Sequence, residues 1–376
     1  MKIIRKYPYM GRLLCLVVFF FLSSVSFNPT LSAENGNGDV YLPFVPSNTI
    51  STPTADEMWI SAARLASLPT TGPAWNNLMN GAQEYANALD ISDQDDDTDV
   101  YILAKALVYA RTGQFQYRSE VIAAITAAMG TETGAGILAV ARNMQSLVIA
   151  AGLIDLETAD PVLNTIFRQW LATMQTTLFD GSGSAFSLRS CHETRPNNIG
   201  THCGASRIAI AIYLKDIAEV QNAADVFKGW LGDRSAYTGF NFGDLDWQCN
   251  PSAPVGINPA DCTRNGYSID GVLPDDQRRG GGFIWPPPQE NYVWEALQGA
   301  VVQAELLNGA GFPTWDWQDK ALLRAITWLY QHANYPAVGD DSWQPWLFNE
   351  VYGTNFLTQA TSSPGKGMGW TDWTHD

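Results

Sequence analysis

Helical periodicity is the feature that most constrains the fold of this chain. Apolar residues recur at three- and four-residue steps through most of the sequence, a pattern that predicts amphipathic helices. The predicted helices cover residues 99–112, 117–129, 135–156, 159–178, 204–215, 218–231, 292–308 and 316–331. Because strand-like alternation is scarce, we expect an all-α fold.

The connections between these segments indicate how the helices pack. Short turns between consecutive helices favour antiparallel pairs, and the lack of a repeat of fixed length argues against a regular solenoid. We therefore expect an (α/α) toroid, or incomplete barrel, with a groove at one rim. The irregular stretch 232–289 is rich in Gly, Pro, Asn and Asp and is expected to wall that groove.

The N-terminal region has the composition of an export signal. Four Lys and Arg residues precede an apolar run at 13–22, which is too short to span a bilayer. Residues 1–33 are therefore predicted to be a signal peptide, 34–56 a flexible spacer and 57–376 a single catalytic domain. A secreted or periplasmic location follows, without stable insertion in a membrane.

The cysteines favour disulfides over a metal site. Removal of the signal peptide leaves Cys191, Cys203, Cys249 and Cys262, an even number in an exported chain. Of the three possible pairings we expect the sequential one, which closes two short loops. Zinc is disfavoured because no CxxC or HxxxH pair is present.

The charge balance limits the partners. The chain has 22 Lys and Arg against 38 Asp and Glu, a formal net charge of −16. Nucleic acid and anionic lipid are therefore poor partners. Binding of an anionic ligand would require a local cluster of cations, for which Arg264, Arg278 and Arg279 are the candidates.

The acidic run SDQDDDTD at 92–99 invites comparison with a calcium loop. Asp93, Asp95 and Asp97 have the spacing of calcium ligands, but Thr98 stands where the loop needs Gly and Ala104 where it needs Glu. We therefore interpret the run as a solvated helix start and expect no metal there.

Polar groups crowd the start of the helix after Asn197. If this helix begins near Asn198, then Asn198 and His202 lie four residues apart on one face. Free amides at a helix start add partial positive charge, so the pair could hold a carboxylate. The alternative is that Asn198 caps the helix and His202 is a packing residue.

A second polar cluster occupies residues 273–297. Arg278 and Arg279 follow two acids and precede three glycines, and Tyr292 opens the next predicted helix. A guanidinium beside Tyr292 would lower the pKa of its phenol and make it a proton shuttle. The alternative is a set of surface ion pairs beside an ordinary core tyrosine.

Tryptophan is abundant, with 14 residues in the chain. Flat aromatic faces suit sugar rings. We predict that Trp285 and Trp294 bind substrate, while most of the other tryptophans pack in the core.

These blocks resemble those of the alginate lyases, a family of helical-toroid polysaccharide lyases. The similarity runs from GPAWNNL through RTGQFQYRSE and ARNMQSLVIAAGLIDL to NNIGTH, DGVLPDDQRRG and NYVWEALQGAVVQAELL, and so covers most of the mature domain. Each block alone is weakly specific, whereas their order and spacing are moderately specific.

The resemblance implies roles for individual residues. Asn198, Arg279 and Tyr292 match the family's functional Asn, Arg and Tyr. The family's histidine position falls on Ile199, and we expect His202 to replace it. The groove residues Arg142, Asn143 and Arg278 are expected to contact substrate.

The implied reaction is β-elimination on a uronate of an acidic polysaccharide, with no cofactor. Asn198, Arg279 and His202 would neutralise the sugar carboxylate as the C5 proton leaves. Tyr292 or His202 would accept that proton, and Tyr292 would protonate the departing oxygen.

Two other functions fit the sequence. A glycoside hydrolase would need two opposed carboxyl groups, for which the candidates are Asp244 with Asp246, Asp275 with Asp276, and Glu290 with Glu295. A non-catalytic sugar-binding protein would be consistent with the isoleucine at the histidine position.

Overall fold

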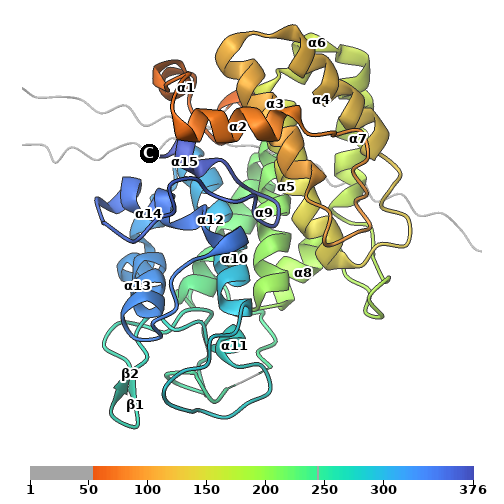
Figure 1. Ribbon diagram of the computed structural model, residues 1–376. Coiled ribbons are helices and arrows are strands. Elements are labelled where there is room, and N and C mark those ends of the chain that lie inside the picture. Colours follow the sequence, from red (N-terminus) through yellow and green to blue (C-terminus); the bar gives the residue numbers. More distant parts are fainter. Residues whose placement is uncertain (1–53, 244) are drawn as a thin grey trace, which may run out of the picture. The chain divides into compact units, whose positions relative to one another are not determined.

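The computed structural model describes residues 54–376 except residue 244 (Figure 1). The description below concerns the described residues of one compact unit, 48–376. The predicted signal peptide, and the spacer as far as residue 53, lie outside the described residues.

The described part is mostly helical, which confirms the all-α prediction. Its helices are η1 (Ala55–Glu57), α1 (Ala62–Ser67), α2 (Pro73–Gln83), α3 (Thr98–Thr112), α4 (Phe115–Ala128), α5 (Ile137–Leu153), α6 (Leu156–Ala159), α7 (Pro161–Met174), α8 (Leu188–Thr194), α9 (Asn198–Tyr213), α10 (Ile217–Leu231), α11 (Pro274–Gln277), α12 (Tyr292–Gly309), η2 (Thr314–Asp316), α13 (Trp317–Gln331), η3 (Gly339–Asp341), α14 (Gln344–Tyr352) and α15 (Thr371–Thr374). Two short strands, β1 (Thr263–Arg264) and β2 (Tyr267–Ser268), form an antiparallel hairpin.

Several predicted helix boundaries differ from the structure for local reasons. The predicted helix 135–156 ends at Leu153, because Asp155 adopts a left-handed backbone conformation (φ 48°) and caps α6 instead. α9 starts at Asn198, six residues before the predicted 204, because its first turn is polar and lacks an apolar period. Residues 54–56 of the predicted spacer join the folded unit, since η1 packs on α5.

The acidic run before α3 is only partly solvated. α3 begins at Thr98 with Asp97 as its N-cap. Asp99 is fully buried, and burial raises the pKa of its carboxyl well above the usual value. Within residues 54–376, apart from 244, no group of three or more His, Cys, Asp or Glu residues is arranged to hold a metal ion.

The centre of the unit is a row of packed helices in which α3 contacts α5, α5 contacts α9 and α9 contacts α12 (Figure 1). α9 and α12 lie in close contact at Gly299, where a Cβ atom would overlap the backbone of Thr201 and His202. Further along, Gly204 lies against the side chain of Gln303. Because the contacting positions rise together along both helices, α9 and α12 run parallel and begin at the same end.

Both disulfides have the sequential pairing that the sequence predicted. Cys191–Cys203 joins α8 to α9, and Cys249–Cys262 closes the loop that precedes β1. Two such bonds are consistent with an oxidising compartment. In the part of the chain described here, no helix is both long and apolar enough to cross a membrane.

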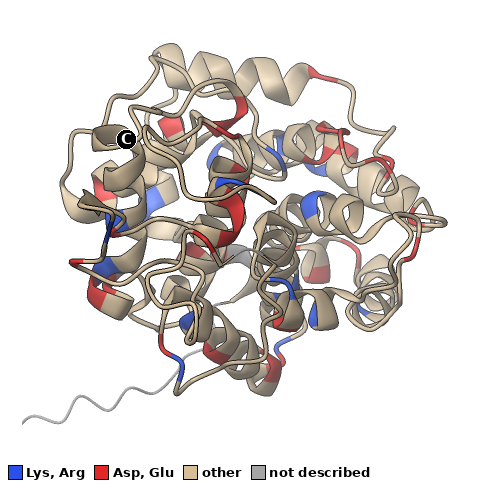
Figure 2. Ribbon diagram, turned by 90° about the horizontal axis from the view of Figure 1, so that it is seen from below, with Lys and Arg blue, Asp and Glu red and all other residues tan. Residues whose placement is uncertain are grey.

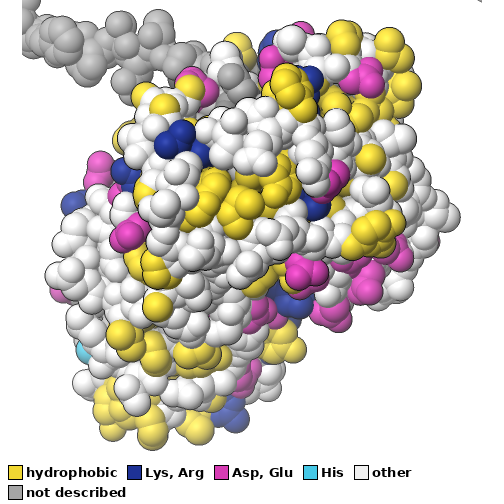
Figure 3. Space-filling view, turned by 45° about the horizontal axis from the view of Figure 1, so that its top comes forward, with side chains coloured by type: hydrophobic (Ala, Val, Ile, Leu, Met, Phe, Trp, Pro, Cys, Tyr) yellow, Lys and Arg dark blue, Asp and Glu magenta, His cyan; other side chains and the backbone are white. Residues whose placement is uncertain are grey.

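Charged side chains are unevenly distributed over the surface. On the face in Figure 3, acidic side chains gather towards one side and hydrophobic ones form several separate groups. Seen from the side of α11 and the hairpin, Lys and Arg segments lie beside Asp and Glu segments (Figure 2). Ion pairs join Arg279 to Asp276 and Arg324 to Asp270.

We expect Gly299→Ala to lower the free energy of unfolding by about 1–3 kcal/mol, because backbone atoms of α9 cannot move aside as a flexible side chain can. Gly309→Ala, at the end of the same helix, is the matched control: its Cβ would meet its nearest neighbour at 3.4 Å, an ordinary contact. Urea unfolding of both variants measures the difference. Equal midpoints would show that the α9–α12 contact is not close-packed.

Candidate functional site

The starts of α9 and α12 bring together three of the predicted site residues. Asn198 is the first residue of α9, Tyr292 is the first residue of α12, and Arg279 lies in the loop just after α11. The parallel packing of α9 and α12 places these residues at one end of the molecule's helical core. Two helix starts at one place add partial positive charge there.

The Asn198 side chain uses both ends of its amide. Nδ2 donates to Glu295 Oε2 at 2.7 Å, and Oδ1 accepts a hydrogen bond from Arg279 Nη2. Asn198 is not the N-cap, a position that Asn197 holds. The asparagine therefore links α12 to the loop that carries Arg279.

Arg279 is held by three partners. Besides Asn198, its Nη2 donates to Asp276 Oδ1 at 2.7 Å, and its guanidinium lies over the ring of Tyr292, 3.9 Å from the centroid. Its Nε is buried and has no hydrogen-bond partner among the described residues. Tyr292 is 41% exposed, so this cluster reaches the surface of the protein.

Glu295 connects three helices at the site. Its carboxylate accepts hydrogen bonds from Arg142 Nη2 of α5 at 2.6 Å, from Asn198 of α9 at 2.7 Å, and from Asn291 Nδ2 at 3.2 Å. From the sequence, Glu295 was a candidate only for the carboxyl pair of a hydrolase. Its place one turn after Tyr292 on α12 was the available signal for a role beside the tyrosine.

The two acids of α11 point to different neighbours. Asp275 Oδ1 accepts from the Gly243 amide at 2.9 Å, whereas Asp276 Oδ1 accepts from Arg279 and from the Asn198 amide, the latter at 3.3 Å. Burial raises the pKa of Asp276 to about 7, although Arg279 opposes that shift. Near neutral pH, Asp276 is therefore the group that sets the charge next to Arg279.

His202 lies beneath the site and does not reach its surface. It is 0% exposed, and neither ring nitrogen has a hydrogen-bond partner within residues 54–376 other than 244. Burial, and then the charges of Arg142 and Lys366, lower its pKa well below the usual value, so the imidazole is neutral. The prediction that His202 contacts the sugar directly therefore conflicts with its burial. Ile199 packs partly buried against the core.

Arg142 and Asn143 are also buried. Arg142 Nη1 donates to the backbone oxygen of Gln94 at 3.2 Å, and Asn143 Nδ2 donates to that of Asp93 at 2.8 Å. The acidic loop before α3 thus covers these side chains. Arg142 also holds Glu295 through Nη2. Both side chains are buried, so neither lines an open groove as predicted.

The other three predicted substrate contacts differ in exposure. Trp294 is 0% exposed and packs edge-on against Tyr330 and Tyr335, so its ring has no face for a sugar. Trp285 is partly exposed and stacks on Tyr267. Arg278 turns back on its own loop, where Nη1 donates to Gly282 O at 3.2 Å.

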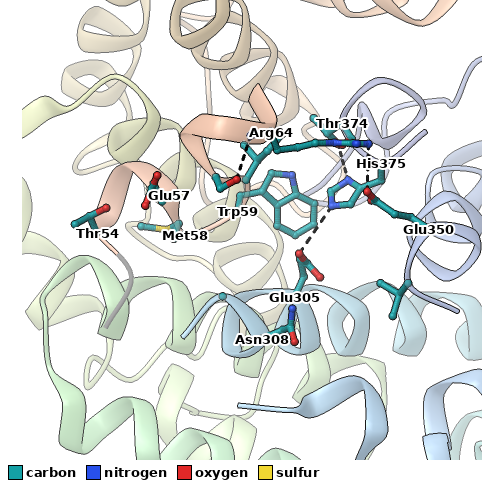
Figure 4. Close-up of a pocket in the computed structure, with 14 residues that line it drawn as sticks. Thr54, Glu57, Met58, Trp59, Arg64, Glu305, Asn308, Glu350, Thr374 and His375 are labelled. Atoms are coloured by element: carbon teal, nitrogen blue, oxygen red, sulfur yellow. Dashed lines mark hydrogen bonds and ion pairs between the residues drawn. The ribbon is translucent and has the colours of Figure 1, made fainter. Parts of the chain in front are cut away.

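A cavity of about 550 Å³ lies at the other end of α12 (Figure 4). Its lining includes Glu305, Arg64 and His375, and Glu305 points towards His375, with 3.9 Å between Oε1 and Nε2. Ten residues of helix separate Glu295 from Glu305, which is roughly 15 Å. This cavity is therefore not part of the Asn198–Arg279–Tyr292 cluster.

Comparisons of the chain with protein-family models, with curated proteins and with solved structures find no match.

The raised pKa of Asp276 predicts how stability depends on pH. The unfolded carboxyl titrates near pH ~4, and the folded one at about 7. Below the pKa of the unfolded chain, the protonated Asp276 carboxyl makes its full contribution to the free energy of unfolding. This contribution is lost as the pH rises to the pKa of the folded protein, because ionisation of the carboxyl favours the unfolded chain.

Asp276→Asn keeps an Oδ1 acceptor for Arg279 and for the Asn198 amide but does not titrate. We therefore expect wild type to lose stability relative to Asp276→Asn as pH rises from about 4 to about 7, with no further change above. Urea unfolding of both proteins across this pH range measures the difference in their stability. Parallel stability curves would mean that Asp276 ionises normally in the folded protein.

Proposed function

We propose that the protein is a polysaccharide lyase that cleaves a uronic-acid-containing, alginate-like polysaccharide by β-elimination. The observation that carries the proposal is the meeting of the Asn198 amide, the Arg279 guanidinium and the Tyr292 phenol at two parallel helix starts. These are the groups needed to neutralise a carboxylate and to move a proton beside it.

Arg279 is the proposed partner of the sugar carboxylate. Its Nη2 edge is already engaged by Asn198 and Asp276, which fixes the plane of the guanidinium. The Arg279 side chain is 29% exposed, which gives an incoming carboxylate access to the guanidinium. A positioned donor of this kind stabilises the charge that grows on the carboxylate as the C5 proton leaves, and its loss costs roughly 10²–10³ in rate.

Tyr292 is the proposed base and acid. The step starts from the phenolate: the Tyr292 oxygen takes the C5 hydrogen as a proton, the C–H electrons form the C4–C5 double bond, and the C4–O bond breaks. The proton then passes from Tyr292 to the departing oxygen, so no water is consumed. The exposed position of the ring and the contact of its face with Arg279 support this role.

The buried residues around the site are proposed to act on the reaction only through the residues that they hold in place. Glu295 holds the Asn198 amide by its Nδ2, and Arg142 in turn holds Glu295. We assign both to positioning. Because His202 is neutral and buried one turn below Asn198, we propose that it shapes the polar layer under the site rather than exchanging a proton with the sugar.

We further propose a toroidal architecture and an extracellular or periplasmic location for the enzyme. The succession α3, α5, α9, α12 supports an incomplete (α/α) toroid, with the stapled loops after α10 walling a substrate groove. The two disulfides support an exported protein that acts on an acidic polysaccharide. The proposed chemistry requires no metal or other cofactor.

A glycoside hydrolase is the second candidate, and one observation favours it. Asp276 and Glu295 both hydrogen-bond Asn198, one at its backbone amide and the other at its side chain, so two carboxyl groups flank the site. With a pKa of about 7, Asp276 could serve as an acid. The engagement of both carboxyls by Arg279 or Arg142 makes this reading weaker.

A substrate screen separates the lyase from the hydrolase. We expect the purified domain to release products with new ultraviolet absorbance from at least one of alginate, polyglucuronate, pectate and glycosaminoglycans, because elimination creates a double bond conjugated to the carboxylate. New reducing ends without that absorbance would identify a hydrolase, and no product from any of them would contradict both enzymes.

Tyr292→Phe tests the proposed proton transfer. The variant keeps the ring under Arg279 but lacks the phenol, so we expect kcat to fall by roughly 10²–10⁴ with KM little changed. Tyr85→Phe, which removes a phenol from another exposed ring, is the control and should retain activity. Wild-type turnover by Tyr292→Phe would remove Tyr292 from the mechanism.

A further inference from the structure

An exposed, stacked aromatic pair lies in the loops beyond the site. The rings of Tyr267 and Trp285 have centroids 4.4 Å apart and planes inclined by only 12°. Tyr267 is 42% exposed, although a stacked ring in the core would be covered. We call these two residues the aromatic platform.

The position of Tyr267 is set by a tight hairpin. Asn265 and Gly266 both have positive φ values, 50° and 84°, and Arg264 pairs directly with Tyr267 across the turn. An Asn-Gly pair with these angles is the turn that matches the twist of two antiparallel strands. Tyr267 therefore follows a turn with little conformational freedom.

The platform is also supported from behind. Trp328 is buried in α13, meets Trp285 edge-on with centroids 6.5 Å apart, and donates from Nε1 to Ser268 O at 2.9 Å. The Cys249–Cys262 disulfide closes the loop directly before the hairpin. An exposed ring that is already fixed in place loses little entropy when it binds a ligand.

The platform is connected to the proposed catalytic residues through one loop. Residues 280–291 run from Arg279 to Tyr292, and Trp285 lies in the middle of them. Six residues from Arg279 can span at most about 20 Å. A polysaccharide chain seated at Arg279 and Tyr292 can therefore reach Trp285 within a few sugar units.

We propose that Tyr267 and Trp285 form a distal subsite that stacks on a pyranose ring of the uronan, away from the ring being cleaved. This inference rests on the proposed function and adds to it a preference for long substrates. Sugar rings present C–H faces that pack on aromatic rings. The subsite carries no charge of its own, so it would hold a sugar by its face while Arg279 holds the carboxylate of another.

Two measurements test the subsite, one of binding and one of catalysis. In the Tyr292→Phe background, native electrophoresis through gels containing alginate or polyglucuronate measures retardation without cleavage. We expect Tyr267→Ala to weaken this retardation by roughly three- to tenfold in apparent Kd. Tyr267→Phe, which keeps the ring, should preserve most of it, and Tyr85→Ala is the matched exposed-tyrosine control.

For catalysis, the ratio of kcat/KM on polymer to that on a uronate trisaccharide should fall in Tyr267→Ala, mainly through KM. It should stay unchanged in Tyr85→Ala.

The outcomes separate the subsite from the lyase activity. If the Tyr292→Phe protein is retarded and the added Tyr267→Ala change leaves the retardation equal, the proposed subsite is wrong, even if the wild-type protein catalyses elimination. If the Tyr292→Phe protein is retarded and Tyr267→Ala weakens that retardation, but the wild-type protein cleaves no uronan, the aromatic platform stands and the lyase proposal fails. If neither gel retards the Tyr292→Phe protein, the subsite proposal is overturned.

Discussion

The close contact of α9 and α12 at Gly299 is the constraint on which the site depends. With no side chain at this position, the helices approach until their backbones touch, and they run parallel. Two helix starts then lie at one end, and each begins with a candidate functional residue, Asn198 or Tyr292. A larger residue at 299 would separate the amide from the phenol even if neither were changed.

The same geometry explains how a strongly acidic chain can offer a place for an anion. The two helix starts contribute partial positive charge, and Arg279 and Arg142 add full charges. The carboxyl groups of Glu295 and Asp276 offset much of this positive charge. They also hold the two arginines and Asn198 in fixed orientations. Since burial favours the protonated form of Asp276, the local balance becomes more positive below about pH 7. The net charge of the chain is therefore a poor guide to the charge of the site.

Sequence patterns predicted much of the framework, for identifiable reasons. Apolar periodicity indicated the long helices, and short spacing between cysteines indicated both disulfides. The polar blocks around Asn198 and Tyr292 led us to expect that these residues group with Arg279, and Arg279 contacts both of them.

What the sequence could not predict depends on burial and on partners far along the chain. Trp294 and His202 belong to helices whose two sides look equally apolar, so the pattern did not reveal that both face inward. Glu295 was undervalued because its main partner, Arg142, is 153 residues away. Tyr267 was missed because a single aromatic residue in a loop has no signal until its stacking partner is known.

The most direct measurement of the central claim is a crystal structure of the inactive Tyr292→Phe variant with a bound uronate oligosaccharide. The proposed elimination predicts a sugar carboxylate within hydrogen-bond distance of Arg279, with the C5 hydrogen of the same ring facing the side chain of residue 292. An oligosaccharide bound elsewhere, for instance in the cavity lined by Arg64 and Glu305, or a ring at the site with its carboxylate turned away from Arg279, would contradict it.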